Sequence, residues 1–189
     1  MVFARPEWHS RLPWPMLESM NAAGIDLHTL DTLAESEAER LLLTCCASPQ
    51  WARSIAARRP FGTVAALLAA ADDALSALPE SELDRALSGH PRIGDRPDNA
   101  DSGREQAAVI TAGDAVRAEL AAGNRAYEDR FGHIYLVCAT GRSADELLAI
   151  LRSRLHNDVS TERGIVRKEL GKINRIRLRR LVGEDGARP

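Results

Sequence analysis

The stretch TERGIVRKELGKINRIRLRRLV, residues 161–182, predicts a helix that begins at Thr161 and ends by Val182. At about 100° per residue, its apolar residues fall on one face of the helix, as in a helix packed against a core. That face is formed by Val166, Leu170, Ile173, Ile176 and Leu181. The stretch therefore predicts a long amphipathic helix at the C-terminal end of a helical domain.

Arg177 lies in the middle of this apolar face, four residues after Ile173 and four before Leu181. An unpaired guanidinium group is costly to bury, so Arg177 must find anionic or carbonyl partners. Two interpretations remain open, a structural buried pair or an anion-binding residue. Arg163 and Arg180 also lean towards the apolar face, but near the helix ends, where their charged groups can reach water.

Capping patterns predict the other helices. They place helix starts at Ser36, Ser48, Thr63, Ser81, Ser102, Gly113 and Ser143. Residues 131–139 are the one β-like run, and because no partner strand is predicted we expect a buried connector. Aromatic residues make up only 4% of the chain, so the core must consist of Ala, Leu, Ile and Val, which favours helices. We predict an all-α, single-domain multi-helix bundle over residues 29–182, an N-terminal arm over 1–28 and a disordered tail over 183–189.

Composition narrows the function classes. The net charge is −2, which gives no support to binding of nucleic acid or an anionic membrane. The basic residues of the last helix are interpreted as a solvated face, with a nucleic-acid-binding stripe as the alternative: Arg167, Lys168, Lys172, Arg175 and Arg179. The five histidines are scattered and lack ligand spacing, so we expect no metal site. The odd set Cys45, Cys46 and Cys138, without a secretory leader, predicts reduced cysteines in a cytoplasmic protein.

The loop that contains His90 is the strongest candidate site. Gly89 is expected to close a helix with positive φ, and Pro91 keeps His90 out of the α region, which leaves the imidazole exposed. Ser102 and Glu105 have the spacing of a capping box, or Glu105 forms an acid/base pair with His90, with Gln106 as an orienting amide. For a lone histidine, the alternative is a solvated loop residue without function.

Several ordered motifs resemble the 2-oxo-4-hydroxy-4-carboxy-5-ureidoimidazoline (OHCU) decarboxylase family. They are His90-Pro91, Ser102-x-x-Glu105-Gln106, Asn124-x-x-Tyr127-x-x-Arg130-Phe131-Gly132, Gly141-Arg142-Ser143, Arg154-Leu155-x-Asn157-Asp158-x-x-x-x-Glu162 and Ile176-Arg177-Leu178. The resemblance extends from about Leu41 to Val182. It implies an all-helical carboxy-lyase, usually a homodimer, that acts without a cofactor in the last step from urate to (S)-allantoin. Functional coupling to uricase and hydroxyisourate hydrolase is implied as well.

The resemblance also implies roles for individual residues. His90 is the implied catalytic acid/base, supported by Glu105, whose negative charge is expected to raise the basicity of the imidazole. The implied substrate-binding residues are Pro91, Ser102, Glu105, Gln106, Phe131, Gly132, His133, Ile134, Tyr135 and Arg177. His133-Ile134 departs from the family pattern, in which many members have an aromatic residue followed by proline. Two alternatives remain: the same site acting on a related ureido acid, or a non-catalytic helical binding module.

Overall fold

The computed structural model describes residues 24–95, 100–110 and 112–184. All regular elements of these residues are helices, which confirms the all-α prediction. Their bounds are α2 Leu27–Thr32, α3 Glu35–Cys45, α4 Pro49–Ala56, α5 Val64–Ser76, α6 Glu80–Ser88, α7 Ala100–Glu105, α8 Ala107–Ile110, α9 Asp114–Phe131, α10 Ala144–Arg154 and α11 Val159–Leu181.

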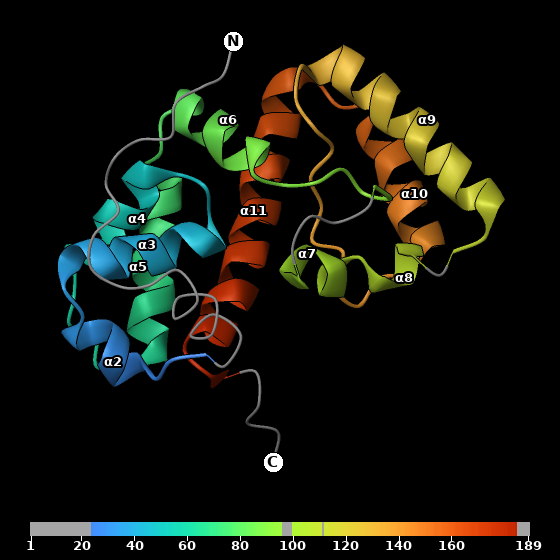
Figure 1. Cartoon of the computed structure of the whole chain (residues 1–189). Coiled ribbons are helices and arrows are strands. Elements are labelled where there is room, and N and C mark those ends of the chain that lie inside the picture. The colour runs from blue at the N-terminus through green and yellow to red at the C-terminus, as the bar shows by residue number, and fades with distance from the viewer. Residues whose placement is uncertain (1–23, 96–99, 111, 185–189) are drawn as a thin grey trace, which may run out of the picture.

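The long helix α11 divides the molecule into two groups of helices (Figure 1). Helices α2 to α6 lie on one side of α11, and α7 to α10 lie on the other. The predicted apolar face of α11 is confirmed, because Val166, Leu170, Ile173 and Leu181 are buried and Ile176 packs against the core. α11 thus supplies apolar side chains to the core between it and α2 to α6.

The connector after α9 joins two apolar clusters. Leu136 and Cys138 belong to the cluster formed with α2–α6 and α11, whereas Tyr135, Val137 and Ala139 belong to the cluster formed with α9 and α10. Side chains that alternate between two sides are the pattern of an extended chain. The prediction of a buried connector is therefore confirmed, and the connector runs between the two clusters without a partner strand among the described residues.

Three of the predicted caps are present. The side-chain oxygens of Ser48, Thr63 and Ser143 accept hydrogen bonds from the backbone N–H three residues further on, and Ser143 forms a complete capping box with Glu146. The predicted start of the last helix at Thr161 was two residues late. Asp158 caps α11 by accepting hydrogen bonds from the N–H and the hydroxyl of Thr161, at 2.9 and 2.6 Å.

The predictions for Ser36 and Ser81 were wrong. α3 begins at Glu35 and α6 at Glu80, and neither helix has a side-chain cap. Both helices instead carry two acidic residues in their first turn, where negative charge interacts favourably with the free N–H groups and the helix dipole.

A short helix not predicted from the sequence, α2, follows Asp26, whose carboxylate accepts a hydrogen bond from Thr29 N–H at 2.6 Å. Ile25 is buried, and its N–H donates to the Leu181 carbonyl oxygen at 2.7 Å, so this segment belongs to the helical body. The predicted arm lies outside the described residues up to position 23. The predicted tail lies outside them from position 185.

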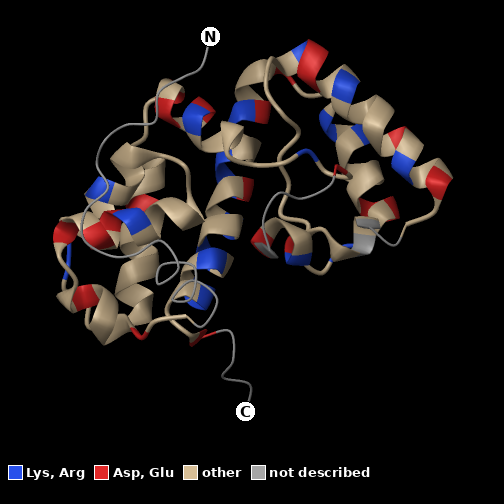
Figure 2. Ribbon diagram, viewed as in Figure 1, with Lys and Arg blue, Asp and Glu red and all other residues tan. Residues whose placement is uncertain are grey.

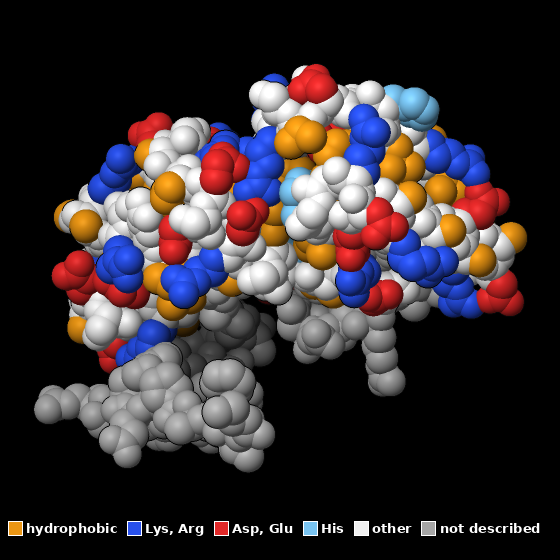
Figure 3. All heavy atoms as spheres, turned by 90° about the horizontal axis from the view of Figure 1, so that it is seen from above, with side chains coloured by type: hydrophobic (Ala, Val, Ile, Leu, Met, Phe, Trp, Pro, Cys, Tyr) orange, Lys and Arg blue, Asp and Glu red, His pale blue; other side chains and the backbone are white. Residues whose placement is uncertain are grey.

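Charged side chains of both signs are interspersed over the helices and over the face seen from above (Figures 2 and 3). All three cysteines are buried and free, as predicted. Within the described part of the chain, no helix combines the length and the apolar character needed to cross a membrane.

Candidate active site

A cavity lies where the turn after α6, helix α7, the connector and α11 meet. It encloses about 290 Å³ of space outside the protein atoms, including open solvent at its mouth. The residues that line it are His90, Pro91, Ile93, Ser102, Glu105, Gln106, Tyr135, Leu136, Val137, Ala139 and Ile173. The structure therefore brings together the predicted residues His90, Pro91, Ser102, Glu105, Gln106 and Tyr135.

The backbone around His90 differs from the prediction. Gly89 ends α6 with φ of −83°, so glycine is not needed there for a left-handed conformation. The close approach of the turn between α3 and α4 explains the glycine instead, because a Cβ atom at this position would lie 2.6 Å from the Cβ of Ala47 in that turn. The following N–H, that of His90, donates to the Leu87 carbonyl oxygen at 3.0 Å. The turn that carries the imidazole is thereby pressed against the helical body.

The imidazole of His90 is half-buried, not exposed as predicted. Burial, together with the positive charge of Arg177, lowers the pKa of His90 to about 3. The expected increase in basicity from Glu105 is not found, because Arg177 already pairs with that carboxylate. No described residue forms a hydrogen bond with the His90 ring, which lines the cavity.

Three side chains fix the loop that follows His90. Gln106 accepts a hydrogen bond from Gly94 N–H at 2.9 Å and donates to the Arg92 carbonyl oxygen at 3.3 Å. Asn124 of α9 donates to the Ile93 carbonyl oxygen at 2.8 Å. The Arg92 guanidinium group forms two hydrogen bonds with the Glu128 carboxylate, at 2.5 and 2.7 Å. Gln106, which was predicted to be an orienting amide, thus orients this loop. Helix α9 supplies two further anchors, Asn124 and Glu128, of which only Asn124 belongs to a motif noted in the sequence.

Arg177 finds the partners that its position on the apolar face required. Its Nε and Nη2 atoms donate to the two Glu105 carboxylate oxygens, each at 2.8 Å, and its Nη1 donates to the Cys45 carbonyl oxygen at 3.3 Å. The Arg177 and Glu105 side chains are only 6% and 9% exposed. Arg177 also lies 3.5 Å from the Ser102 hydroxyl oxygen. Arg177 is not among the residues that line the cavity, whereas its partner Glu105 is.

The capping-box interpretation of Ser102 and Glu105 was therefore wrong. Ser102 is the third residue of α7, which begins at Ala100, and Glu105 is the last residue of this helix. Both side chains lie towards α11 because Arg177 binds them. Spacing alone could not distinguish a cap from a pair of residues that share a distant cationic partner.

Most of the predicted 131–135 segment lies away from the cavity. Phe131 ends α9, and Gly132 follows it with φ of +75°, the left-handed conformation that favours glycine at a helix end. The His133 ring stacks on Phe131 with 6.2 Å between ring centres, and its Nδ1 lies 3.0 Å from the Ile134 carbonyl oxygen. From this segment only Tyr135 lines the cavity, and the wall continues to Ala139. The wall formed by residues 135–139 therefore belongs to the β-like run that the sequence showed at residues 131–139.

A buried network supports this wall from behind. Arg154 of α10 donates to the Glu162 carboxylate from Nε at 2.8 Å and from Nη2 at 2.5 Å. Its Nη1 donates to the Leu136 carbonyl oxygen at 2.7 Å. Tyr127 and Asn157 also donate to Glu162, whose side chain is fully buried. Burial alone would raise the pKa of Glu162, but these hydrogen bonds, with the charge of Arg154, keep that pKa below its ordinary value.

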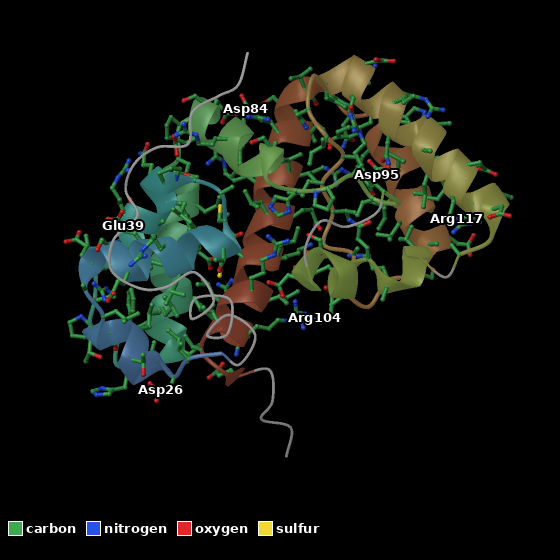
Figure 4. All side chains as sticks on the ribbon, viewed as in Figure 1. Asp26, Glu39, Asp84, Asp95, Arg104 and Arg117 are labelled. Atoms are coloured by element: carbon green, nitrogen blue, oxygen red, sulfur yellow. The ribbon has the colours of Figure 1, made fainter. Side chains whose placement is uncertain are left out.

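Glu169 completes the support of the wall by accepting a hydrogen bond from Cys138 N–H at 2.9 Å. The connector has no partner strand, so these charged side chains satisfy backbone groups that a sheet would otherwise pair. Figure 4 shows how side chains fill the space between α11 and the helices α9 and α10. Among the described residues, no group of three or more His, Cys, Asp or Glu side chains is arranged to hold a metal ion.

Comparison with known proteins agrees with this geometry. The family model described as OHCU decarboxylase matches residues 31–179. Over 148 residues the chain is 30% identical to "Uric acid degradation bifunctional protein TTL" of Arabidopsis thaliana, a match that covers 74% of this chain and 46% of that protein. The chain therefore spans about half the length of this relative. Over 143 residues it is 29% identical to the 2-oxo-4-hydroxy-4-carboxy-5-ureidoimidazoline decarboxylase of Amia calva, covering 71% of this chain and 81% of that protein.

Two solved structures share the fold. A crystal structure of OHCU decarboxylase in the presence of (S)-allantoin matches with a TM-score of 0.68 and 29% identity, over 74% of this chain and 95% of that one. A crystal structure of (S)-allantoin synthase, at 18% identity, has a TM-score of 0.64 over 82% of this chain and 53% of that one, and supports the fold alone. Because the family model covers most of the chain, this protein belongs to the OHCU decarboxylase family.

Proposed function

We propose that this protein is a carboxy-lyase that converts OHCU to (S)-allantoin and CO2 in urate degradation. The observation that carries the proposal is the cavity in which the imidazole of His90 faces the same space as Ser102 and the arginine-bound Glu105. Family membership and the likeness to a decarboxylase structure obtained with (S)-allantoin support the same reaction.

The chemistry requires a proton to be moved, and His90 is the group suited to move it. When CO2 leaves C4, the electron pair of the broken bond can delocalise into the ring towards C5 and its imine nitrogen, which takes a proton from solvent. The resulting enol then gives its hydroxyl proton to a base, and C5 receives a proton on one face. A neutral His90 can accept the hydroxyl proton of the enol and, as an imidazolium, deliver a proton to C5. The net charge of the residue is therefore unchanged after each turnover.

Glu105 and Arg177 are proposed to handle the charge of the substrate. A tight grip on the departing carboxylate would oppose the loss of CO2, whereas stabilisation of the charge that develops on the ring would assist it. We assign this stabilisation to Arg177. Ser102 is proposed to bind the ureido arm, together with the one amide hydrogen of Gln106 that the loop leaves unused.

The rival function of a nucleic-acid-binding module receives little support from α11. Its basic residues Arg167, Lys172, Arg175 and Arg179 form ion pairs with acidic side chains of the protein. Those ion pairs reduce the positive charge that a phosphate backbone would meet. The rival within the enzyme class is an enzyme with the same site that acts on a related ureido acid. The shape of the cavity decides between that substrate and OHCU.

The decisive assay generates OHCU from urate with uricase and hydroxyisourate hydrolase and follows circular dichroism after this protein is added. We expect rapid growth of the (S)-allantoin signal above the slow racemic background. His90→Ala should lower turnover by roughly two to four orders of magnitude while the far-ultraviolet spectrum stays unchanged. A background rate with folded wild-type protein would refute the decarboxylase function, and near wild-type turnover in His90→Ala would remove His90 from the mechanism.

The family resemblance also leads us to propose a homodimer in the cytoplasm that is functionally coupled to the two preceding enzymes. Light scattering after size exclusion would give the mass in solution, with about 41 kDa expected for two 20.6 kDa chains. A mass of one chain across micromolar concentrations would refute the dimer.

A further inference from the structure

We propose that Arg180 is a positioning residue that draws the Glu105 carboxylate away from Arg177 when an anionic substrate enters the cavity. The inference rests on the proposed function, since it concerns how the same cavity accepts the charge of its substrate. It starts from the order in which charged groups lie between the protein surface and the cavity.

Two short-range patterns place four charges between facing helices. Asp101 and Glu105 are four residues apart on α7, and Arg177 and Arg180 are three residues apart on α11, so each pair shares one helix face. Arg180 lies 3.4 Å from the Asp101 carboxylate and 3.9 Å from that of Glu105. The signs therefore alternate along the series Asp101, Arg180, Glu105 and Arg177.

Glu105 occupies the position that an anion in the cavity would need. It lines the cavity, whereas Arg177 lies behind it, with Arg177 Nε and Nη2 both bound to its carboxylate. An anionic substrate would therefore meet a carboxylate before it met the guanidinium group. Because both groups are more than nine-tenths buried, the repulsion would be weakly screened. Glu105 must give up part of its contact with Arg177 before that cation can interact with the substrate.

Arg180 is placed to receive the carboxylate. It is 20% exposed and its Nη1 is already within 3.9 Å of Glu105 Oε1, the same oxygen that accepts the Arg177 Nε bond. Asp101 competes with Glu105 for Arg180, and Asp101 is itself bound by Arg104, which lies on the outer side of α7 (Figure 4). Removing the charge of Arg180 and removing the charge of Asp101 should therefore have opposite effects on substrate binding.

The test compares KM and kcat of four proteins in the OHCU assay: wild type, Arg180→Gln, Asp101→Asn and the double variant. Arg180→Gln should raise KM by roughly two- to fivefold, the range expected for the loss of one partly exposed charge pair. Asp101→Asn should lower KM, because it removes the carboxylate charge that competes with Glu105 for Arg180. In the double variant the benefit of Asp101→Asn should disappear. Arg179→Gln is the matched control, since Arg179 is exposed and pairs with Glu184.

Each outcome decides a separate question. An unchanged KM in Arg180→Gln would overturn the inference, and so would a benefit of Asp101→Asn that persists in the double variant, because that would be a through-space effect of charge. Thermal unfolding of each variant shows whether a change in KM reflects loss of fold. If wild type does not turn over OHCU, the proposed function fails by itself.

In that case calorimetric titration with orotate, a cyclic ureide that carries a carboxylate, tests the same order of affinities among the four proteins. The same order of dissociation constants would support Arg180 without the decarboxylase reaction. Equal constants for wild type and Arg180→Gln, or no binding by any of the four proteins, would overturn the role of Arg180.

Discussion

Replacing Arg154 with methionine should destabilise the protein by about 4 kcal/mol. Methionine keeps the apolar stem of the side chain but leaves the fully buried Glu162 with only the neutral donors Tyr127 and Asn157. Loss of one member of a buried ion pair costs about 3–5 kcal/mol, and this range includes the penalty for the charge left behind. The Leu136 carbonyl oxygen also loses its partner. For a domain of this size, the corresponding fall in melting temperature is about 8–16 °C.

Urea denaturation at neutral pH, followed by far-ultraviolet circular dichroism, measures this loss. Arg152→Met is the matched control, because Arg152 lies in the same helix and pairs with Glu119 at the surface, where its side chain is 63% exposed. The control should lose less than about 1 kcal/mol. An Arg154→Met variant no less stable than the control would refute the assignment of Arg154 and Glu162 as the buried support of the connector.

A second variant separates the fold from the cavity wall. Arg154→Met combined with Glu162→Leu removes both charges, so much of the lost stability should return. The Leu136 carbonyl oxygen still lacks its donor in this double variant, so the wall stays unanchored. Turnover should therefore remain low although unfolding occurs at a higher urea concentration than in Arg154→Met alone. Full recovery of both properties would show that the network serves stability alone.

Two further predictions concern the turn that carries His90. Because the pKa of His90 is lowered to about 3 in the native protein, this histidine binds a proton below pH 6.5 in the unfolded chain but not in the native state. The contribution of the neutral ring is therefore fully present above pH 6.5 and is lost as pH falls from 6.5 towards 3, and His90→Gln should show a shallower decline in urea midpoint between pH 7.5 and 5. Equal pH dependence in the two proteins would contradict the lowered pKa. Gly89→Ala should shift the turn because its Cβ would meet that of Ala47, at a cost of about 1–3 kcal/mol and with reduced turnover. Gly164→Ala is the control and should not destabilise the protein, because nothing lies within 4 Å of its added Cβ. Urea denaturation and the OHCU assay compare the two variants, and a Gly89→Ala protein as stable and active as wild type would refute the contact.

Local patterns predicted the parts of the fold that depend on neighbours in sequence. Ser48, Thr63 and Ser143 cap helices because the bonded N–H lies three residues away. The period of α11 placed its apolar face correctly and showed that Arg177 needs a partner. The identity of that partner, Glu105, depends on the packing of α7 against α11 across 72 residues of sequence, which no local pattern encodes. The same limit applies to Gly89, which is required by its contact with Ala47 in the turn between α3 and α4 and not by its own φ angle.

The site also explains why two interpretations of Arg177 could not be separated by sequence. In the free protein Arg177 is a structural residue, because Glu105 and the Cys45 carbonyl oxygen hold its charge in the interior. The same arrangement places that charge one carboxylate away from the cavity, so the structural pair can serve as the anion-binding group when Glu105 has another cation to bind. Arg180 is that cation in our proposal. A buried pair whose anionic member lines a cavity is therefore compatible with both interpretations, and variants of the second arginine distinguish them better than removal of Arg177, which would also unpair a buried carboxylate.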